Sequence, residues 1–175
     1  MVATGGPPGT LIDVAGHATP ALAVLSRHRI PHTVHRYDVP VETPDYGRAV
    51  ADVLGQAPHR VFKTLVTEVD GQLTVAVVPV TGDLDLKALA AAVGGKRAAL
   101  AERTAAERAT GYVRGGISPL GQRQRLPTVV DESSKSLDTV LVSAGRRGLQ
   151  VELPSADLIR LTNARLAPIS RPASR

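Results

Sequence analysis

A strongly predicted β-hairpin constrains the fold of this chain more than any other feature. Two β-branched, apolar segments, Lys63 to Val69 and Leu73 to Val80, flank Asp70-Gly71, a dipeptide that strongly favours a tight hairpin turn. The stretch 75–80 is apolar throughout and does not alternate with polar residues. We therefore expect the second strand to be buried on both faces of a sheet.

A single lysine interrupts the first of these strands. Only four of the 21 basic residues are lysines, and one of them is Lys63, within Val61-Phe62-Lys63-Thr64-Leu65-Val66. A lysine is a compact point charge, so this position suggests a site that needs one directed ammonium group. The simpler interpretation is a strand residue that faces water while its stem covers apolar neighbours. The hexamer alone leaves both interpretations open.

Composition narrows the class of protein. A chain of 175 residues is long enough for one domain with a proper core. The net charge of +5 and the pI near 10.1 favour anionic partners, with nucleic acid first and acidic lipid second. Only 2% of residues are aromatic, which argues against a broad base-stacking surface. The absence of cysteine excludes disulfides, thiolate metal sites and a thiol nucleophile.

The order of predicted elements indicates an α+β fold with a mixed sheet or open barrel flanked by helices. Thr19-Pro20 predicts the start of a helix of about ten residues. Further helices are predicted at 46–54, 83–93, 98–109 and 156–162, the last capped by Ser155, and further strands at 32–37, 127–131, 139–143 and 149–153. We expect a flexible extension at 1–18, one domain at 19–168 and a short basic tail at 169–175. No apolar run suits a membrane span or a secretion signal, so the expected location is the cytoplasm.

The sequence lacks the patterns that mark several common catalytic and binding sites. His32 and His35 fall on opposite faces of a predicted strand, which is poor metal geometry, and no serine sits in a G-x-S-x-G context. The glycine-rich segment 110–122 has no Gly-Lys-Ser/Thr ending of a phosphate-binding loop. What remains is a lysine on a strand, a glycine-rich loop able to present backbone N–H groups, and clustered arginines. We predict no metal and no cofactor.

Several motifs, in order and spacing, resemble the YbaK family of Cys-tRNA(Pro) deacylases, within the wider group of prolyl-tRNA editing domains. The motifs are Phe62-Lys63-Thr64-Leu65, Thr110-Gly111-Tyr112, Gly115-Gly116-Ile117-Ser118-Pro119-Leu120-Gly121, Leu126-Pro127-Thr128 and Ser143-Ala144-Gly145-Arg146-Arg147-Gly148-Leu149. The resemblance runs from about Thr19 to Ala167. It implies a single α+β domain with a barrel-like mixed sheet.

The resemblance also implies roles for particular residues. Lys63 matches the essential lysine of the family, near the 3′-terminal adenosine of the aminoacyl-tRNA. The implied substrate-binding residues are Tyr37, Tyr46, Thr64, Gly115, Gly116, Ser118, Pro119, Ser143 and Gln150, and the implied tRNA-binding residues are Arg114, Arg123, Arg125, Arg146 and Arg147. One departure matters, because many relatives carry an acid at the position of Gln150. The way in which the substrate amine is oriented is therefore in doubt here.

The implied activity is trans-acting deacylation of Cys-tRNA(Pro), with Cys-tRNA(Cys) as a further substrate. In this subfamily the thiol of the substrate is thought to attack its own ester, which asks the protein only for orientation and oxyanion stabilisation. The alternatives are an Ala-tRNA(Pro) hydrolase of the same group and a non-catalytic basic module that binds tRNA or a synthetase. Expected partners are the acceptor end of tRNA(Pro) and prolyl-tRNA synthetase, and neither a membrane nor DNA is expected.

Overall fold

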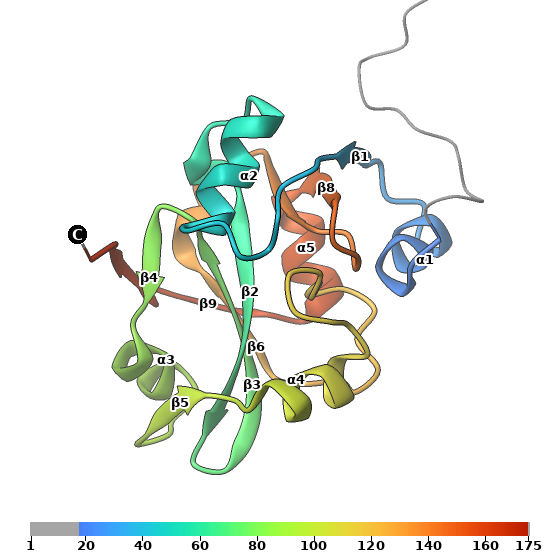
Figure 1. The fold of residues 1–175 in the computed structure, drawn as a ribbon. Coiled ribbons are helices and arrows are strands. Elements are labelled where there is room, and N and C mark those ends of the chain that lie inside the picture. Colours follow the sequence, from blue (N-terminus) through green and yellow to red (C-terminus); the bar gives the residue numbers. More distant parts are fainter. Residues whose placement is uncertain (1–17, 175) are drawn as a thin grey trace, which may run out of the picture.

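The computed structural model describes residues 18–174, so the predicted N-terminal extension lies, apart from residue 18, outside the described residues. Helices and strands alternate irregularly along the chain (Figure 1). Their order is α1 Pro20–Arg27, β1 Thr33–Arg36, α2 Tyr46–Leu54, β2 Phe62–Val69, β3 Gln72–Pro79, β4 Gly82–Leu84, α3 Leu86–Ala92, β5 Ala98–Leu100, α4 Arg103–Thr110, β6 Thr128–Asp131, β7 Thr139–Ser143, β8 Leu149–Pro154, α5 Ser155–Thr162, β9 Arg165–Ala167 and β10 Ser170–Pro172. Two 3₁₀ turns, Pro58–Arg60 and Glu132–Ser136, precede β2 and β7.

The predicted hairpin is confirmed and forms the centre of the molecule. β2 and β3 pair antiparallel over their whole length, from Phe62 opposite Pro79 to Val69 opposite Gln72. They belong to a five-stranded sheet of order β5-β2-β3-β6-β9, in which β6 runs parallel to both of its neighbours. The sheet is thus mixed, as predicted, and no closed barrel forms among residues 18–174.

Both faces of the five-stranded sheet are covered, which explains the unbroken apolar run in β3. On one face Val75 and Val77 pack into a core with α1, α5 and the three-stranded sheet β1-β8-β7. On the other face Ala76 and Val78 pack against α3 and Ile169. Figure 1 shows β2 and β3 running through the middle of the molecule, with α3 and α1 on opposite flanks. Burial on both faces is therefore confirmed.

The edge of β2 that faces away from β3 is paired only in part. Near its start, Val61 forms a parallel β-bridge with Leu141 of β7, and near its end Thr67, Glu68 and Val69 pair with β5. Between these two attachments, the residues of β2 have no strand partner on this side within the described chain. The gap between β7 and β5 positions the candidate site described below.

Helix starts were predicted with mixed success. Thr19 is the cap of α1, and its Oγ1 accepts the N–H of Leu22 at 3.1 Å, as predicted. The helix predicted at 83–93 begins only at Leu86, because Asp85 caps it. Ser155 was wrongly predicted as a cap, since its hydroxyl donates to the carbonyl oxygen of Ser134 and the residue is already helical.

The segment 98–109 was wrongly predicted as one helix. Ala98–Leu100 instead forms strand β5 and pairs with the end of β2. The helix α4 starts at Arg103, after this pairing ends. The alanine-rich composition favoured a helix, but the exposed edge of β2 offers hydrogen bonds that decide the local structure.

The C-terminal residues complete a small sheet. Ser170–Pro172, which fall in the predicted basic tail, form β10 and pair antiparallel with β4. The carboxylate of the buried residue Asp131 holds them in place, because its Oδ1 accepts the N–H groups of Ile169 and Ser170, each at 3.0 Å. Among residues 18–174, no helix combines the length and apolar character that a membrane crossing requires.

Candidate active site

A cavity of about 440 Å³ lies along the partly paired edge of β2. Its walls come from α2, β2, the end of β5 with the residue that follows it, the loop 111–121, and the adjacent strands β7 and β8. The structure thus brings together side chains that are more than 80 residues apart in sequence. The predicted site residues that line the cavity are Tyr46, Lys63, Thr64, Arg114, Gly115, Ser143 and Gln150.

Lys63 lies half-buried at this cavity. Its ammonium group makes no hydrogen bond or ion pair with any other residue from 18 to 174. Asp83 is near enough to feel its charge: a hydrogen bond from the Ser174 N–H chiefly lowers the pKa of Asp83, and Lys63 lowers it further. A lysine that makes no ion pair with a carboxylate among the described residues thus lines the cavity, and such a charge suits a site for an anionic or oxyanionic group.

Two buried polar atoms in the cavity wall have no partner. Neither Oγ1 of Thr64 nor Oε1 of Gln150 forms a hydrogen bond in the structure, although both atoms are shielded from solvent. Leaving such an atom unpaired costs about 1–3 kcal/mol, so unpaired buried polar groups are uncommon in folded proteins. Of the three such side-chain atoms among the described residues, two belong to residues that line this cavity, which suits a polar ligand that would complete their bonding.

The register of the β7–β8 hairpin places Gln150 beside Ser143. The two residues lie directly opposite each other in the antiparallel pair, so their side chains share one face. Oγ of Ser143 accepts the N–H of Gly145 at 3.2 Å, which leaves its hydroxyl proton available. Ser143 can therefore donate to a ligand, whereas Oε1 of Gln150 can accept from one.

The backbone of β2 adds polar groups to the same cavity. The carbonyl oxygen of Val66 accepts a hydrogen bond from Ala101, so the backbone groups of Val66 point away from β3. Because this direction alternates along an antiparallel strand, the N–H and C=O of Thr64 also point away from β3, toward the gap in the sheet. The N–H of Thr64 could donate a hydrogen bond to a substrate carbonyl there, just as it would donate to a neighbouring strand.

A tyrosine of the wall is bonded to a second tyrosine behind it. The Tyr46 ring lines the cavity, and the Tyr37 hydroxyl lies 2.8 Å from the Tyr46 hydroxyl. Burial, together with this hydrogen bond, raises the pKa of Tyr46 well above its usual range, although the nearby Arg147 acts in the opposite direction. Tyr46 is therefore a neutral hydroxyl at any physiological pH. Tyr37 does not line the cavity itself.

The glycine-rich loop is packed against the turn between β7 and β8. Gly115 has φ +84, and a Cβ there would lie 2.7 Å from a methyl group of Val41. At Gly116 a Cβ would lie 2.9 Å from backbone atoms of Arg146 and Arg147. These two close approaches require glycine, so the loop can hold its position at the cavity only with this sequence.

Hydrogen bonds from arginines fasten the same loop. The Arg147 guanidinium donates through Nε to the Arg114 carbonyl oxygen at 2.7 Å, and the Arg114 N–H donates to Glu107 at 3.1 Å. The exposed side chains of Arg114 and Arg147 thus lie at the rim of the cavity. This position is compatible with phosphate contacts next to the site.

Five other predicted residues do not line this cavity. Ser118 is fully buried, and its Oγ accepts the Leu120 N–H, so its bonding is internal to the loop. Pro119, Arg123 and Arg125 line a separate cleft beside α1. Arg146 is exposed in the β7–β8 turn and does not line the cavity.

Sequence reasoning missed the contribution of the β5 region. Leu100 and Ala101 line the cavity, and Leu100 is 63% exposed although it is a large apolar residue. The prediction of a helix at 98–109 gave no reason to place Leu100 at the cavity, because Leu100 reaches it only through the pairing of β5 with β2. Among residues 18–174, no group of three His, Asp or Glu side chains could hold a metal ion.

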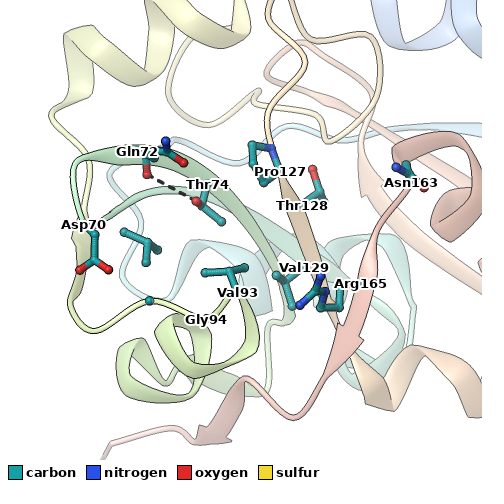
Figure 2. Close-up of a pocket in the computed structure, with 12 residues that line it drawn as sticks. Asp70, Gln72, Thr74, Val93, Gly94, Pro127, Thr128, Val129, Asn163 and Arg165 are labelled. Atoms are coloured by element: carbon teal, nitrogen blue, oxygen red, sulfur yellow. Dashed lines mark hydrogen bonds between the residues drawn. The ribbon is translucent and has the colours of Figure 1, made fainter.

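A larger cavity, about 520 Å³, lies at the opposite end of the hairpin and contains none of the predicted site residues (Figure 2). Its charged groups are already bonded within the protein. Asp70 accepts the N–H groups of Lys96 and Arg97, and Arg165 donates to the carbonyl oxygen of Ala92. Because the cavity beside β2 contains unpaired polar atoms and a free ammonium, we take that one as the candidate active site despite its smaller volume.

Comparison with known proteins identifies the family of the chain. The profile of the aminoacyl-tRNA editing domain matches residues 42–161, which include β2, the glycine-rich loop and the β7–β8 hairpin. The chain belongs to this family. The predicted resemblance is thereby confirmed.

Two curated relatives are similar over most of the chain. "Putative Cys-tRNA(Pro)/Cys-tRNA(Cys) deacylase EbsC" of Enterococcus faecalis is 37% identical over 157 residues, which is 87% of this chain and 93% of the relative. "Multifunctional Ser/Thr-tRNA deacylase ProXp-y" of Escherichia coli is 32% identical over 130 residues, covering 71% and 78%. A solved structure, described as a "putative trans-editing enzyme for prolyl tRNA synthetase", shares the fold with a TM-score of 0.76 at 22% identity, covering 93% of this chain and 99% of that one.

Proposed function

We propose that this protein is a trans-acting aminoacyl-tRNA deacylase that removes cysteine from tRNA(Pro), with Cys-tRNA(Cys) as a further substrate. The observation that carries the proposal is one cavity lined by Lys63, whose ammonium has no partner among residues 18–174, and by Thr64 and Gln150, whose Oγ1 and Oε1 are buried without a partner. Membership of the editing family and 37% identity to the Enterococcus protein support the reaction class and the cysteine substrate.

The cavity supplies orientation and charge, and the substrate supplies the nucleophile. The cysteinyl thiol loses its proton and its sulfur attacks the ester carbonyl carbon, which places negative charge on the carbonyl oxygen. The Lys63 ammonium and the backbone N–H of Thr64 stabilise this oxyanion. The carbon–oxygen bond to the ribose then breaks, the ribose oxygen takes up a proton, and a thiolactone and free tRNA leave.

Gln150 binds the α-ammonium group of the substrate. Its unpaired Oε1 is a neutral acceptor, and an ammonium donor would complete its bonding. A neutral amide attracts the ammonium less strongly than a carboxylate would. We therefore expect this chain to bind the amine weakly and to rely on the tRNA for much of its affinity.

A panel of charged tRNAs tests the proposal. Purified protein is given tRNA(Pro) charged with Cys, Ala, Ser or Thr, as well as Cys-tRNA(Cys), and ester cleavage is followed over time. The proposal requires cleavage of the cysteine esters to be fastest. Preferred cleavage of the Ala ester would instead support an Ala-tRNA(Pro) hydrolase. Preferred cleavage of the Ser and Thr esters would support the activity for which the Escherichia relative is named.

The chemical step has its own test. Alkylating the sulfur of Cys-tRNA(Pro) should abolish cleavage, while the blocked substrate still competes with the free one for binding. Equal cleavage of the alkylated substrate would show that water is the nucleophile. No cleavage of any charged tRNA, with tRNA binding retained, would leave the non-catalytic tRNA-binding module. Parallel reactions that contain prolyl-tRNA synthetase test whether this enzyme is a partner. The expected place of action is the cytoplasm.

A further inference from the structure

A second, strongly basic cleft lies beside α1. It has a volume of about 310 Å³ and is formed by the C-terminal end of α1 and the loop 119–126. Arg27 contributes from the end of α1, His28 from the residue after it, and Arg123 and Arg125 from the loop, whereas no aspartate or glutamate lines it. We call it the α1 cleft. Three guanidinium groups around one hollow create a positive potential that favours an anion.

The arginines of the α1 cleft are not neutralised by the protein. Arg27, Arg123 and Arg125 are exposed, and none of their side chains makes a hydrogen bond or ion pair with another residue in the range 18–174. Other arginines of the chain do pair with carboxylates, namely Arg48, Arg60, Arg103 and Arg160. The charge of the α1 cleft is thus available to an external partner.

The loop that carries two of these arginines is rigidly held. The N–H of Arg123 donates to Thr110 and that of Gln124 to Ala109, both at 2.9 Å, which fastens the loop to the end of α4. The buried Tyr112 hydroxyl also donates to the Leu120 carbonyl oxygen at 2.6 Å. A platform fixed in this way loses little conformational entropy when it binds a ligand.

The two walls of the cleft are fixed to each other through a glycine. Gly121 has φ +66, and a Cβ there would lie 2.6 Å from the carbonyl carbon of Pro20, in the first turn of α1. Such an approach is possible only without a side chain. The backbone segments that carry the arginine of α1 and those of the loop are therefore held against each other, while the exposed side chains remain able to adjust to a ligand.

We propose that the α1 cleft binds backbone phosphates of the tRNA acceptor stem while the charged 3′ end occupies the cavity beside β2. This inference rests on the proposed function. The same loop connects the two sites, since Arg114 and Gly115 line the cavity and Arg123 and Arg125 line the cleft. Gly115 and Arg123 are eight positions apart in the chain, so their Cα atoms are at most roughly 29 Å apart, a distance that several nucleotides can span.

Arginine chemistry favours phosphates as the ligand. A guanidinium is planar and can donate two parallel hydrogen bonds to one phosphate, which lysine cannot. Contacts of this kind release counterions from RNA, so each lost contact reduces the slope of log K against log salt by about 0.7–0.9. This slope distinguishes phosphate binding from other causes of reduced affinity.

The test uses uncharged tRNA(Pro), so it needs no turnover. Dissociation constants are measured across a range of salt concentrations for the wild type, for the double variant Arg123→Ala/Arg125→Ala, and for Arg27→Gln on the other wall. The double variant should bind roughly tenfold more weakly at low salt, with a slope smaller by about 1.5, and Arg27→Gln should reduce the slope by about 0.8. Lys87→Ala/Lys135→Ala removes two exposed charges elsewhere and should leave the slope unchanged.

Two outcomes would overturn the inference. One is an unchanged slope in the cleft variants while thermal melting shows them to be folded, and the other is an equal reduction in the lysine control. Weaker binding of prolyl-tRNA synthetase with unchanged tRNA binding would assign the cleft to an acidic protein surface instead. Failure of the proposed function looks different, because tRNA binding and its salt slope would then be retained while no charged tRNA is cleaved.

Discussion

The Tyr37 hydroxyl lies 2.8 Å from the Tyr46 hydroxyl, and the two rings meet edge to face with their centroids 6.3 Å apart. Tyr37 follows β1, while Tyr46 begins α2 and lines the cavity. The contact therefore fixes one wall of the cavity to the three-stranded sheet. Since Tyr46 remains neutral, its hydroxyl contributes a hydrogen bond and not a charge.

Removing the Tyr37 hydroxyl should disturb the cavity through Tyr46. We expect Tyr37→Phe to cost about 1 kcal/mol of folding free energy and to raise KM for the charged tRNA, because the Tyr46 ring loses its anchor. Tyr112→Phe is the matched control, since it also removes one buried hydroxyl hydrogen bond but lies outside the cavity. Urea unfolding and steady-state kinetics on both variants check this, and equal kinetic effects would contradict it.

Loss of the Lys63 charge should affect chemistry more than folding. We expect Lys63→Ala to lower the cleavage rate by on the order of 10² to 10³, as for removal of one oxyanion donor. Lys63→Arg should recover little, because a planar guanidinium cannot replace a compact ammonium. Single-turnover kinetics measure the effect, with Lys87→Ala as the control for general loss of charge. Full activity of a folded Lys63→Ala protein would remove this lysine from the mechanism.

Two threonines on β2 should respond with opposite signs to the same substitution. Thr64→Val removes an unpaired buried hydroxyl, so stability should rise, by up to about 1 kcal/mol, while activity falls. Thr67→Val removes a hydroxyl that donates to the Thr74 carbonyl oxygen at 2.8 Å, so stability should fall by about 1 kcal/mol. Chemical denaturation of both variants gives the comparison. A destabilised Thr64→Val protein would mean that its hydroxyl is bonded in solution.

The energetic effect of the contact between Gly121 and α1 can be measured apart from the effect of backbone strain. Gly121→Ala and Gly55→Ala both place an alanine at nearly the same positive φ, +66 and +65, but only at Gly121 does the new Cβ meet backbone atoms. We expect Gly55→Ala to cost about 1 kcal/mol and Gly121→Ala at least 2 kcal/mol more. Thermal melts compare the two. Equal losses would show that α1 yields easily at this contact.

Glu152 should make stability sensitive to acid. Its pKa is lowered overall: burial alone would raise it, but hydrogen bonds from Thr139, His35 and Arg60 outweigh burial. Because the folded protein holds the carboxylate ionised more tightly than the unfolded chain does, this stabilisation is complete above the unfolded pKa. It is lost as pH falls through the folded pKa. The stability difference between wild type and Glu152→Gln should therefore shrink from about pH 7 to about pH 3 in urea unfolding.

Features determined by local sequence were predictable. The hairpin followed from Asp70-Gly71 between two β-branched segments, and Thr19 correctly predicted the start of α1. Strand β5 was not predictable in this way, because Ala98–Leu100 becomes a strand only through pairing with β2. The hydroxyl of Ser155 was assigned to a cap, but it bonds with Ser134, which is distant in sequence.

The same distinction applies to the candidate site. Lys63 was conspicuous as one of few lysines in an apolar strand, and the structure places it at the cavity. The position of Gln150 opposite Ser143 required the register of β7 and β8, which no local pattern specifies. Arg27 and His28 were not predicted as binding residues, because the α1 cleft brings together residues that are about a hundred positions apart in the sequence.

The hydrogen bonds of Asp131 define where an independently folding fragment can end. The family profile stops at residue 161, yet this buried carboxylate accepts N–H groups from residues 169 and 170. A fragment trimmed to the family boundary would leave Oδ1 of this carboxylate without its two donors, with only the Ser133 N–H still bonded to Oδ2, and would expose the α3 side of the core, which Ile169 covers. Recombinant work should therefore retain the chain through Ser174, whose N–H bonds with Asp83, and attach affinity tags at the N-terminus.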